Sequence, residues 1–176
     1  MSSRRQSVRR LCLVLLSVAV AAIVLRPQVS SALVSRGDDL QYSGDVSRAL
    51  AMYRRALSVD RDNTIAADRF AFLSMTTHAP ENEETGLRLV TEVLARHPGL
   101  IALRYDRALC AHALRRYDQA ARDFEAVGLR ARDPRALTFA ALDFRREHIR
   151  RARELLRLAI RFDPHFEPAR RDLARL

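Results

Sequence analysis

The chain has 176 residues, a formal net charge of +10, five Gly and no Trp. Its content of Ala, Leu and Arg favours helices, and alternating runs of β-branched residues are too few for a β-sandwich or a β-barrel. All 31 basic residues are Arg, and five of them flank the first apolar segment. The remaining 26 Arg and the 21 acidic residues give a net charge of +5, which does not by itself indicate a nucleic-acid partner.

An apolar segment follows an Arg-rich N-terminus. Residues 1–10 carry four Arg, and residues 11–25 hold no group more polar than Ser17 and Cys12. A helix of that length spans about 22 Å against a hydrocarbon core of about 30 Å, and the flanking Arg10 and Arg26 can reach the interfaces. We predict that residues 1–26 are a single-pass anchor in a bacterial inner membrane, with the N-terminus cytoplasmic and the rest of the chain periplasmic.

Cleavage of this segment is the alternative. Pro27 follows the apolar run, and Ser30-Ser31-Ala32 offers small residues at the spacing that signal peptidase requires. The product would be a periplasmic or secreted protein without the first turn of its first repeat helix. Arg4-Arg5 is only a weak match to a twin-arginine signal, since Ser7 stands where that motif has an aromatic residue.

A sequence repeat follows. The segment GDVSRALAMYRRALSVDRDN at 44–63 recurs three times in weaker form, with a small residue, a large residue four positions later and another small residue three positions after that. The copies, each closed five positions on by Pro or Arg, are Ala49, Tyr53, Ala56, Arg61; Gly86, Val90, Val93, Pro98; Ala120, Phe124, Val127, Arg132; and Ala152, Leu156, Ala159, Pro164. Successive copies are offset by 37, 34 and 32 residues. The pattern resembles the tetratricopeptide-repeat (TPR) consensus of about 34 residues.

The first helix of each repeat has a matching small residue where the paired helices must approach closely. These residues are Gly37, Ala71, Ala108 and Ala140. The TPR pattern usually has Leu just before them, whereas Arg36 and Arg107 occupy that position in two copies. We therefore expect local packing to differ from the family at those two places.

Local signals set the predicted boundaries. Asn63-Thr64 and Asp133-Pro134 read as an N-cap followed by the first helical residue, and His97-Pro98-Gly99 reads as a helix stop. We expect extra residues near THAPENEE, 77–84, to form a longer loop. The prediction is an all-α, right-handed superhelical TPR solenoid with repeats at about 30–63, 64–100, 101–132 and 133–166 and a capping helix at 167–176.

The resemblance implies a binding surface on the concave side of the solenoid. Carried onto this sequence, its lining positions are Val34, Asp38 and Gln41; Asp68, Phe72 and Met75; Tyr105, Leu109 and His112; Leu137, Ala141 and Phe144. This set is mainly apolar and lacks the Lys, Asn and Arg residues of chaperone-binding TPR proteins, so we expect a partner that presents an apolar peptide or helix. For each apolar residue the alternative is packing against a neighbouring helix, and Asp38, Tyr105 and His112 are the best candidates for exposed positions.

No catalytic, metal or cofactor motif is found in the sequence. It lacks an H-E-x-x-H motif, a P-loop and a nucleophile elbow, and Cys110 and His112 have no further ligands at suitable spacing. We therefore predict a non-enzymatic scaffold without cofactor or metal. The resemblance to membrane-anchored bacterial TPR proteins implies an accessory role in assembling an envelope or periplasmic complex.

Two other functions remain open. The last repeat concentrates arginines, namely Arg145, Arg146, Arg150, Arg151, Arg153, Arg157 and Arg161, which could bind an acidic surface such as anionic lipid or nucleic acid. Nucleic acid is disfavoured because stacking aromatics are missing beside these arginines. Self-association into a homo-oligomer is the other alternative.

Overall fold

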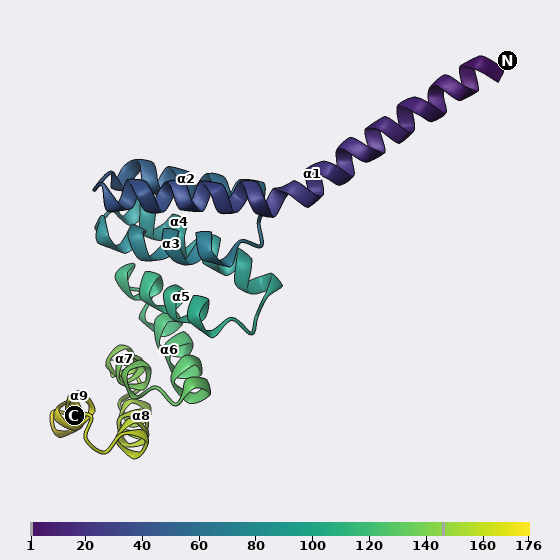
Figure 1. Cartoon of the computed structure of the whole chain (residues 1–176). Helices are drawn as coiled ribbons and strands as arrows, with labels where there is room; N and C mark the ends of the chain where they lie inside the picture. Colours follow the sequence, from purple (N-terminus) through teal and green to yellow (C-terminus); the bar gives the residue numbers. More distant parts are fainter. Residues whose placement is uncertain (1, 146) are drawn as a thin grey trace. The chain divides into compact units, whose positions relative to one another are not determined.

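The computed structural model describes residues 2–145 and 147–176, without the side chains of residues 2–12, 14, 18, 19 and 22. Within this part of the chain it contains α-helices and no strand, as the sequence predicts (Figure 1). The helices are α1 (Ser2–Tyr42), α2 (Val46–Val59), α3 (Thr64–Thr76), α4 (Pro80–Arg96), α5 (Ile101–Ala113), α6 (Tyr117–Ala131), α7 (Pro134–Phe144), α8 (Ile149–Phe162) and α9 (Glu167–Ala174). They belong to two compact units, Met1–Asn63 and Thr64–Leu176.

Helix α1 is continuous through the boundary that the sequence predicts at residues 26–30. It runs for 41 residues with Pro27 inside it, and it bends between its N-terminal part and the part that packs on α2 (Figure 1). Proline removes a backbone donor and disturbs the preceding turn, so it bends a helix that other contacts hold together. Here those contacts are the packing of α1 on α2.

The N-terminal part of α1 exposes apolar side chains. Those more than half exposed are Leu13, Leu15, Leu16, Val20, Ile23, Val24 and Leu25. No helix in the described part of the chain is both long enough and apolar enough to cross a membrane. Some side chains of the anchor predicted at residues 11–25 are not described by the structure, so the anchor stays a prediction.

In the first unit, α1 and α2 meet at the predicted small residue. A Cβ atom added to Gly37 would lie 2.5 Å from Cε1 of Tyr53, whose side chain is completely buried. The Tyr53 hydroxyl donates to Asp38 Oδ1 at 2.7 Å and lies 2.9 Å from Gln41 Oε1. Glycine at this position therefore lets the ring pass directly under the backbone of α1.

Replacing Gly37 with Ala will destabilise the chain by about 1–3 kcal/mol, because the added methyl overlaps a ring that has no room to move. Thermal unfolding followed by circular dichroism measures the loss. Gly99→Ala is the control, since nothing lies within 4 Å of the methyl group that it adds. A Gly37→Ala variant as stable as wild type would contradict the close approach.

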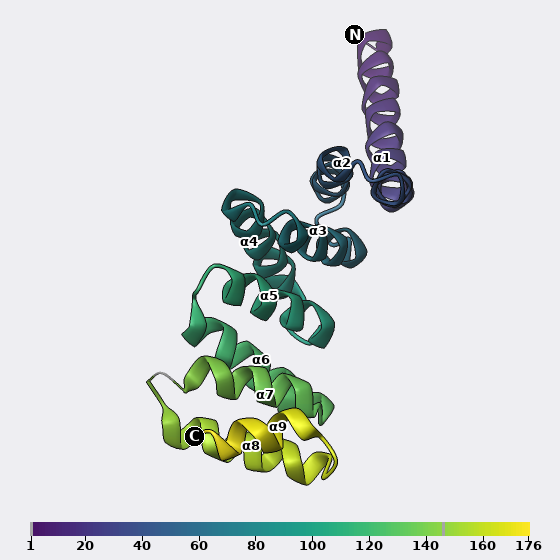
Figure 2. The same ribbon diagram turned by 90° about the vertical axis from the view of Figure 1, so that its left-hand side faces the viewer.

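The second unit stacks helices α3 to α9 in chain order. Each helix contacts the next, and α3 also contacts α5 while α7 contacts α9 (Figures 1 and 2). The predicted small residues Ala71, Ala108 and Ala140 are completely buried, and so are Ala120, Ala152 and Ala159 of the second helices. Small side chains at these points let the helix backbones pack closely, which is what the repeat pattern predicts.

The extra residues near 77–84 extend a helix, so the expected long loop is wrong. Helix α4 begins at Pro80, six residues before Gly86 (86 − 80), whereas α2 begins only three residues before Ala49 (49 − 46). The same distance is three residues in α6 and α8. Pro80 suits the first helical turn, and Glu81 and Glu83 in that turn complement the helix dipole, so the inserted residues add one turn of helix.

The helix ends predicted at Asp133-Pro134 and His97 are confirmed, and α3 begins at Thr64 as predicted. The Asp133 side chain accepts a hydrogen bond from the backbone N–H of Arg135 and caps α7, whose first residue is Pro134. Helix α4 ends with His97 as its C-cap. Helix α9 starts with Pro168 in its first turn and buries Ala169 against the end of the array, where it contacts α7 and α8.

Candidate partner-binding surface

Helices α3 and α5 each carry one continuous stripe that contains the predicted partner-binding positions. On α3 the predicted residues Asp68, Phe72 and Met75 continue with Ile65 at a spacing of three, four and three, and on α5 Tyr105, Leu109 and His112 continue with Ala102 at the same spacing. Residues at this spacing lie on one face of a helix. Phe72 is 54% exposed and Ile65 is 57% exposed, whereas Asp68, Met75, Tyr105 and Leu109 are half-buried. We call these eight residues the α3–α5 face.

The predicted positions on α7 are buried. Leu137 is completely covered and packs against Gly128, where an added Cβ would lie 2.6 Å from the leucine side chain. Ala141 and Phe144 are buried as well. These three residues stabilise helix packing and leave little accessible surface. Phe139, 39% exposed, is the aromatic residue that α7 presents instead.

The predicted positions on α1 belong to the first unit. Val34 is buried, while Asp38 and Gln41 surround the hydroxyl of Tyr53. Their polar atoms therefore take part in the packing of α1 on α2. Asp38 is exposed and Gln41 is half-buried, so both still reach the surface of this unit.

Aromatic contacts support the α3–α5 face from behind. The ring of Tyr105 meets Phe124 of α6 edge-on at 5.4 Å, and Phe124 in turn lies 5.4 Å from Phe139 of α7. Burial raises the pKa of the Tyr105 hydroxyl, with the charge of Asp133 as the next cause. Tyr105 is thus neutral at physiological pH, and its ring is held in place by its contact with Phe124.

A histidine–carboxylate pair joins α5 to α7. His112 Nδ1 lies 2.8 Å from Asp143 Oδ1, and the Asp143 side chain is almost fully buried while His112 is half exposed. This hydrogen bond raises the pKa of His112 against the opposing effect of burial. The second oxygen of Asp143, Oδ2, is buried without a hydrogen-bond partner. Sequence reasoning identified His112 but missed Asp143, because its partner lies 31 residues away.

Replacing His112 with Ala will have an effect that depends on pH. Folding raises the pKa of His112 above its unfolded value of 6.5, so the charged ring stabilises the folded protein fully below pH 6.5. This stabilisation is lost as the pH rises through the pKa of His112 in the folded protein. Because the ring is half exposed, we expect less than about 1 kcal/mol. The difference in melting temperature between wild type and His112→Ala should be larger at about pH 5.5 than at about pH 9. An equal difference at both values would contradict the pairing, and His165→Ala, at an exposed position, is the control.

A carboxyl pair joins α3 to α5. Asp106 is 9% exposed and its Oδ2 has no hydrogen-bond partner. Burial, followed by the charge and the hydrogen bond of Asp68, raises the pKa of Asp106 to about 7. Sequence reasoning selected Asp68 but missed Asp106, because no sequence signal shows that two carboxyl groups 38 positions apart (106 − 68) will meet.

An apolar pocket lies beside this carboxyl pair. Its volume is about 210 Å³, and its lining residues are Thr64, Ile65, Asp68, Leu100, Ala102 and Leu103. Asp68 is the only charged group among them. The pocket can therefore hold an aliphatic chain next to a carboxylate.

Cys110 is not a reactive centre. It is completely buried, and burial, with the charge of Asp106 as the second cause, raises the pKa of its thiol to about 12. A thiol needs its deprotonated form to act as a nucleophile or metal ligand. Cys110 therefore serves the packing between α4 and α5.

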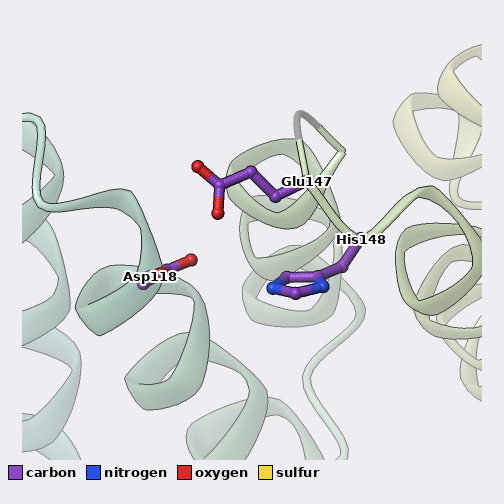
Figure 3. A group of neighbouring side chains, drawn as sticks. All are labelled: Asp118, Glu147 and His148. Atoms are coloured by element: carbon purple, nitrogen blue, oxygen red, sulfur yellow. The ribbon is translucent and has the colours of Figure 1, made fainter.

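Asp118, Glu147 and His148 form an exposed cluster near the start of α8 (Figure 3). Their potential ligand atoms lie within 4.8 Å of one another. The cavity beside Asp118 and Glu147 is also lined by three arginines, Arg115, Arg116 and Arg122. Positive charges there oppose a bound cation, and we assign no metal site to the cluster.

The arginines of the last repeat are partly engaged within the fold. Arg151 of α8 forms ion pairs with Glu125 and Glu154, and Arg153 donates to the backbone oxygen of Leu176. Arg150, Arg157 and Arg161 are exposed on the same helix. The surface of α8 is therefore basic, but less so than its composition suggests.

Comparison with known proteins identifies the fold. No protein-family model and no curated protein matches the sequence. Among solved structures, the chain is similar to MamA residues 41 to the end from Desulfovibrio magneticus RS-1, with 16% identity, a TM-score of 0.70, and 82% of this chain and 81% of that one covered.

Two further structures agree. PilF of Pseudomonas aeruginosa gives a TM-score of 0.64 at 16% identity over 85% of this chain and 68% of that one. A tetratricopeptide-repeat protein from Parabacteroides merdae gives 0.66 at 17% identity over 81% of this chain and 57% of that one. The chain therefore has the TPR fold, as the resemblance of its repeats to that family predicts.

Proposed function

We propose that the protein is a non-enzymatic scaffold that binds a segment of a partner protein on the α3–α5 face. The observation that carries this proposal is the exposure of Ile65 and Phe72, which lie seven residues apart on one face of α3, with Ile65 in the lining of an apolar pocket. Exposed apolar side chains next to a hollow are the usual anchors of protein recognition. An apolar peptide or helix with a few polar groups suits this face.

Site-specific photocrosslinking in the native cell tests the proposal. A benzophenone amino acid replaces Phe72 or Leu109, with Arg150 and Arg157 of α8 as control positions, and mass spectrometry identifies what is captured. We expect the same partner from both face positions and from neither control. Capture from the α8 positions alone, or no capture from any position, would contradict the proposal.

The basic surface of α8 supports a second candidate function, binding to an acidic surface. Arg150, Arg157 and Arg161 are its exposed groups. Binding that releases counterions weakens by orders of magnitude when salt rises from low to moderate concentration, whereas apolar binding changes little. Retention on anionic lipid vesicles at the two salt concentrations distinguishes these functions, and light scattering of the purified chain tests self-association.

For the cellular location we propose a periplasmic domain held at the inner membrane by residues 11–25, in an accessory role for an envelope complex. The exposed apolar side chains of α1 support this. We expect the protein to remain with membranes after alkaline carbonate washing. Release as a shortened, soluble product would establish the cleaved alternative.

Contacts of Ser30 favour the retained form. Its hydroxyl is completely buried, donates to the backbone oxygen of Ala56 at 3.0 Å and accepts from Asn63 Nδ2 at 2.8 Å. Cleavage after Ala32 would remove this side chain and leave the Asn63 amide without that acceptor. The cleaved protein would therefore lose these two hydrogen bonds, which join α1 to α2 and to the residues that follow α2.

A further inference from the structure

We propose that the Asp68–Asp106 pair and the adjacent pocket bind a basic side chain, preferably arginine, of the partner that docks on the α3–α5 face. This inference rests on the proposed function and specifies the chemistry of the partner. It adds a charged anchor to a surface that otherwise offers apolar contacts. Three observations support it: the burial of Asp106, the pairing of two carboxyl groups and the shape of the pocket.

Asp106 is a buried acid, and no basic group is among the causes that shift its pKa. Its Oδ2 atom accepts no hydrogen bond in the described part of the chain, and the group that acts on it electrostatically is the carboxyl of Asp68. Burial and Asp68 both raise the pKa of Asp106, to about 7, and no cation lowers it. Two carboxyl groups joined by a hydrogen bond hold one proton between them, because they cannot both ionise at low cost.

A guanidinium group can replace that proton. It carries a positive charge, and its planar set of N–H donors matches carboxylate oxygens in two parallel hydrogen bonds. The aliphatic stem of the same side chain needs an apolar environment. The pocket supplies it with Ile65, Leu100 and Leu103, and Asp68 lies in the lining of that pocket.

The other ionisable groups near Asp68 and Asp106 do not neutralise the negative charge of the pair. Arg69 of α3 lies 3.6 Å from Asp68, with both side chains nearly half exposed, so water partly screens that contact. On α5, Arg107 is engaged by Asp123 of α6, and the Tyr105 and Cys110 groups have raised pKa values that keep them neutral. Glu83 of α4, another buried acid, acts on Cys110. An incoming basic side chain therefore meets an environment with excess negative potential.

The pair also costs the folded protein stability at neutral pH. Between pH 3.8 and about 7 the unfolded chain releases the Asp106 proton while the folded chain keeps it, so stability falls as pH rises through this range. Asp106→Asn keeps the shape and removes the charge. We expect this variant to melt at a higher temperature than wild type at about pH 8 and at a similar temperature at about pH 4. A lower melting temperature at about pH 8 would contradict the description of the pair.

The binding test uses the full chain in detergent and N-acetyl-L-arginine amide as the probe. N-acetyl-L-citrulline amide, which has the same stem without the charge, is the matched control ligand. NMR titration should show saturable shifts of carboxyl signals with arginine and binding weaker by roughly tenfold or more with citrulline. Asp68→Asn and Asp106→Asn should weaken arginine binding to a similar degree, whereas Asp118→Asn, at an exposed position on α6, should not.

The pH dependence gives an independent readout. Because the guanidinium displaces a shared proton, arginine should bind more weakly at about pH 5.5 than at about pH 7.5, by roughly tenfold. Equal binding of arginine and citrulline, or arginine binding that survives both Asp→Asn changes, would overturn the inference. If Phe72 still captures a partner in the Asp106→Asn background as strongly as in wild type, the inference fails while the scaffold function stands.

Discussion

Replacing Arg107 with Ala will destabilise the chain by about 3–5 kcal/mol. The guanidinium of Arg107 on α5 donates two hydrogen bonds of 2.7 Å to the two oxygens of Asp123 on α6. The Asp123 side chain is only 7% exposed, so removing its partner leaves a buried, uncompensated carboxylate. For a domain of this size the expected fall in melting temperature is roughly 6–20 °C, measured by circular dichroism.

Two control variants distinguish the cost of leaving Asp123 unpaired from the loss of the contacts that Arg107 makes. Arg116→Ala removes an ion pair to Glu84 of 2.8 Å, but both side chains are about half exposed, and we expect a change below about 1 kcal/mol. The double change Arg107→Ala and Asp123→Ala should recover part of the loss, because no unpaired charge remains. If Arg107→Ala costs no more than Arg116→Ala, the pair does not stabilise the second unit as described.

Phe124→Ala is the second change with a large expected effect, about 3–5 kcal/mol. The ring of Phe124 is almost completely buried and contacts Tyr105 of α5 and Phe139 of α7, so its loss opens a cavity among three helices. Tyr105 would lose its contact with the Phe124 ring, and we therefore expect weaker photocrosslinking of the partner at position 109 as well. Thermal unfolding and photocrosslinking measure the two effects.

Phe124→Leu is the matched control because it keeps most of the apolar volume. We expect a smaller loss of stability and nearly unchanged capture. A Phe124→Ala variant that melts within a degree or two of wild type would show that the three aromatic rings do not form a shared core.

Much of the fold is encoded locally and was therefore predictable. Small residues such as Ala71 and Ala108 mark where backbones approach, and caps such as Asp133 followed by Pro134 mark where helices begin. These signals need only neighbouring residues. Arg107 departs from the family pattern in the sequence, but its role depends on Asp123 and appears only in three dimensions.

The candidate surface was predictable in part. The stripe on α3 follows from helical spacing, since Phe72 and its neighbours share one face. Asp106 and Asp143 were missed because their importance comes from burial and from partners on other helices. For Leu137 and Phe144 the alternative of helix packing holds and the surface position does not, since periodicity shows a face but not what packs on it.

The extra turn of α4 suggests how such arrays tolerate change during evolution. Three added residues before Gly86 lengthen the helix at its N-terminal end and leave every later side chain in place. They move the helix start about 300° around the axis, close to a full turn, so the chain enters from nearly the same side, whereas one added residue would move it by about 100°. Insertions of one turn ahead of the small residue are thus a route by which a repeat protein can gain new surface without repacking its core.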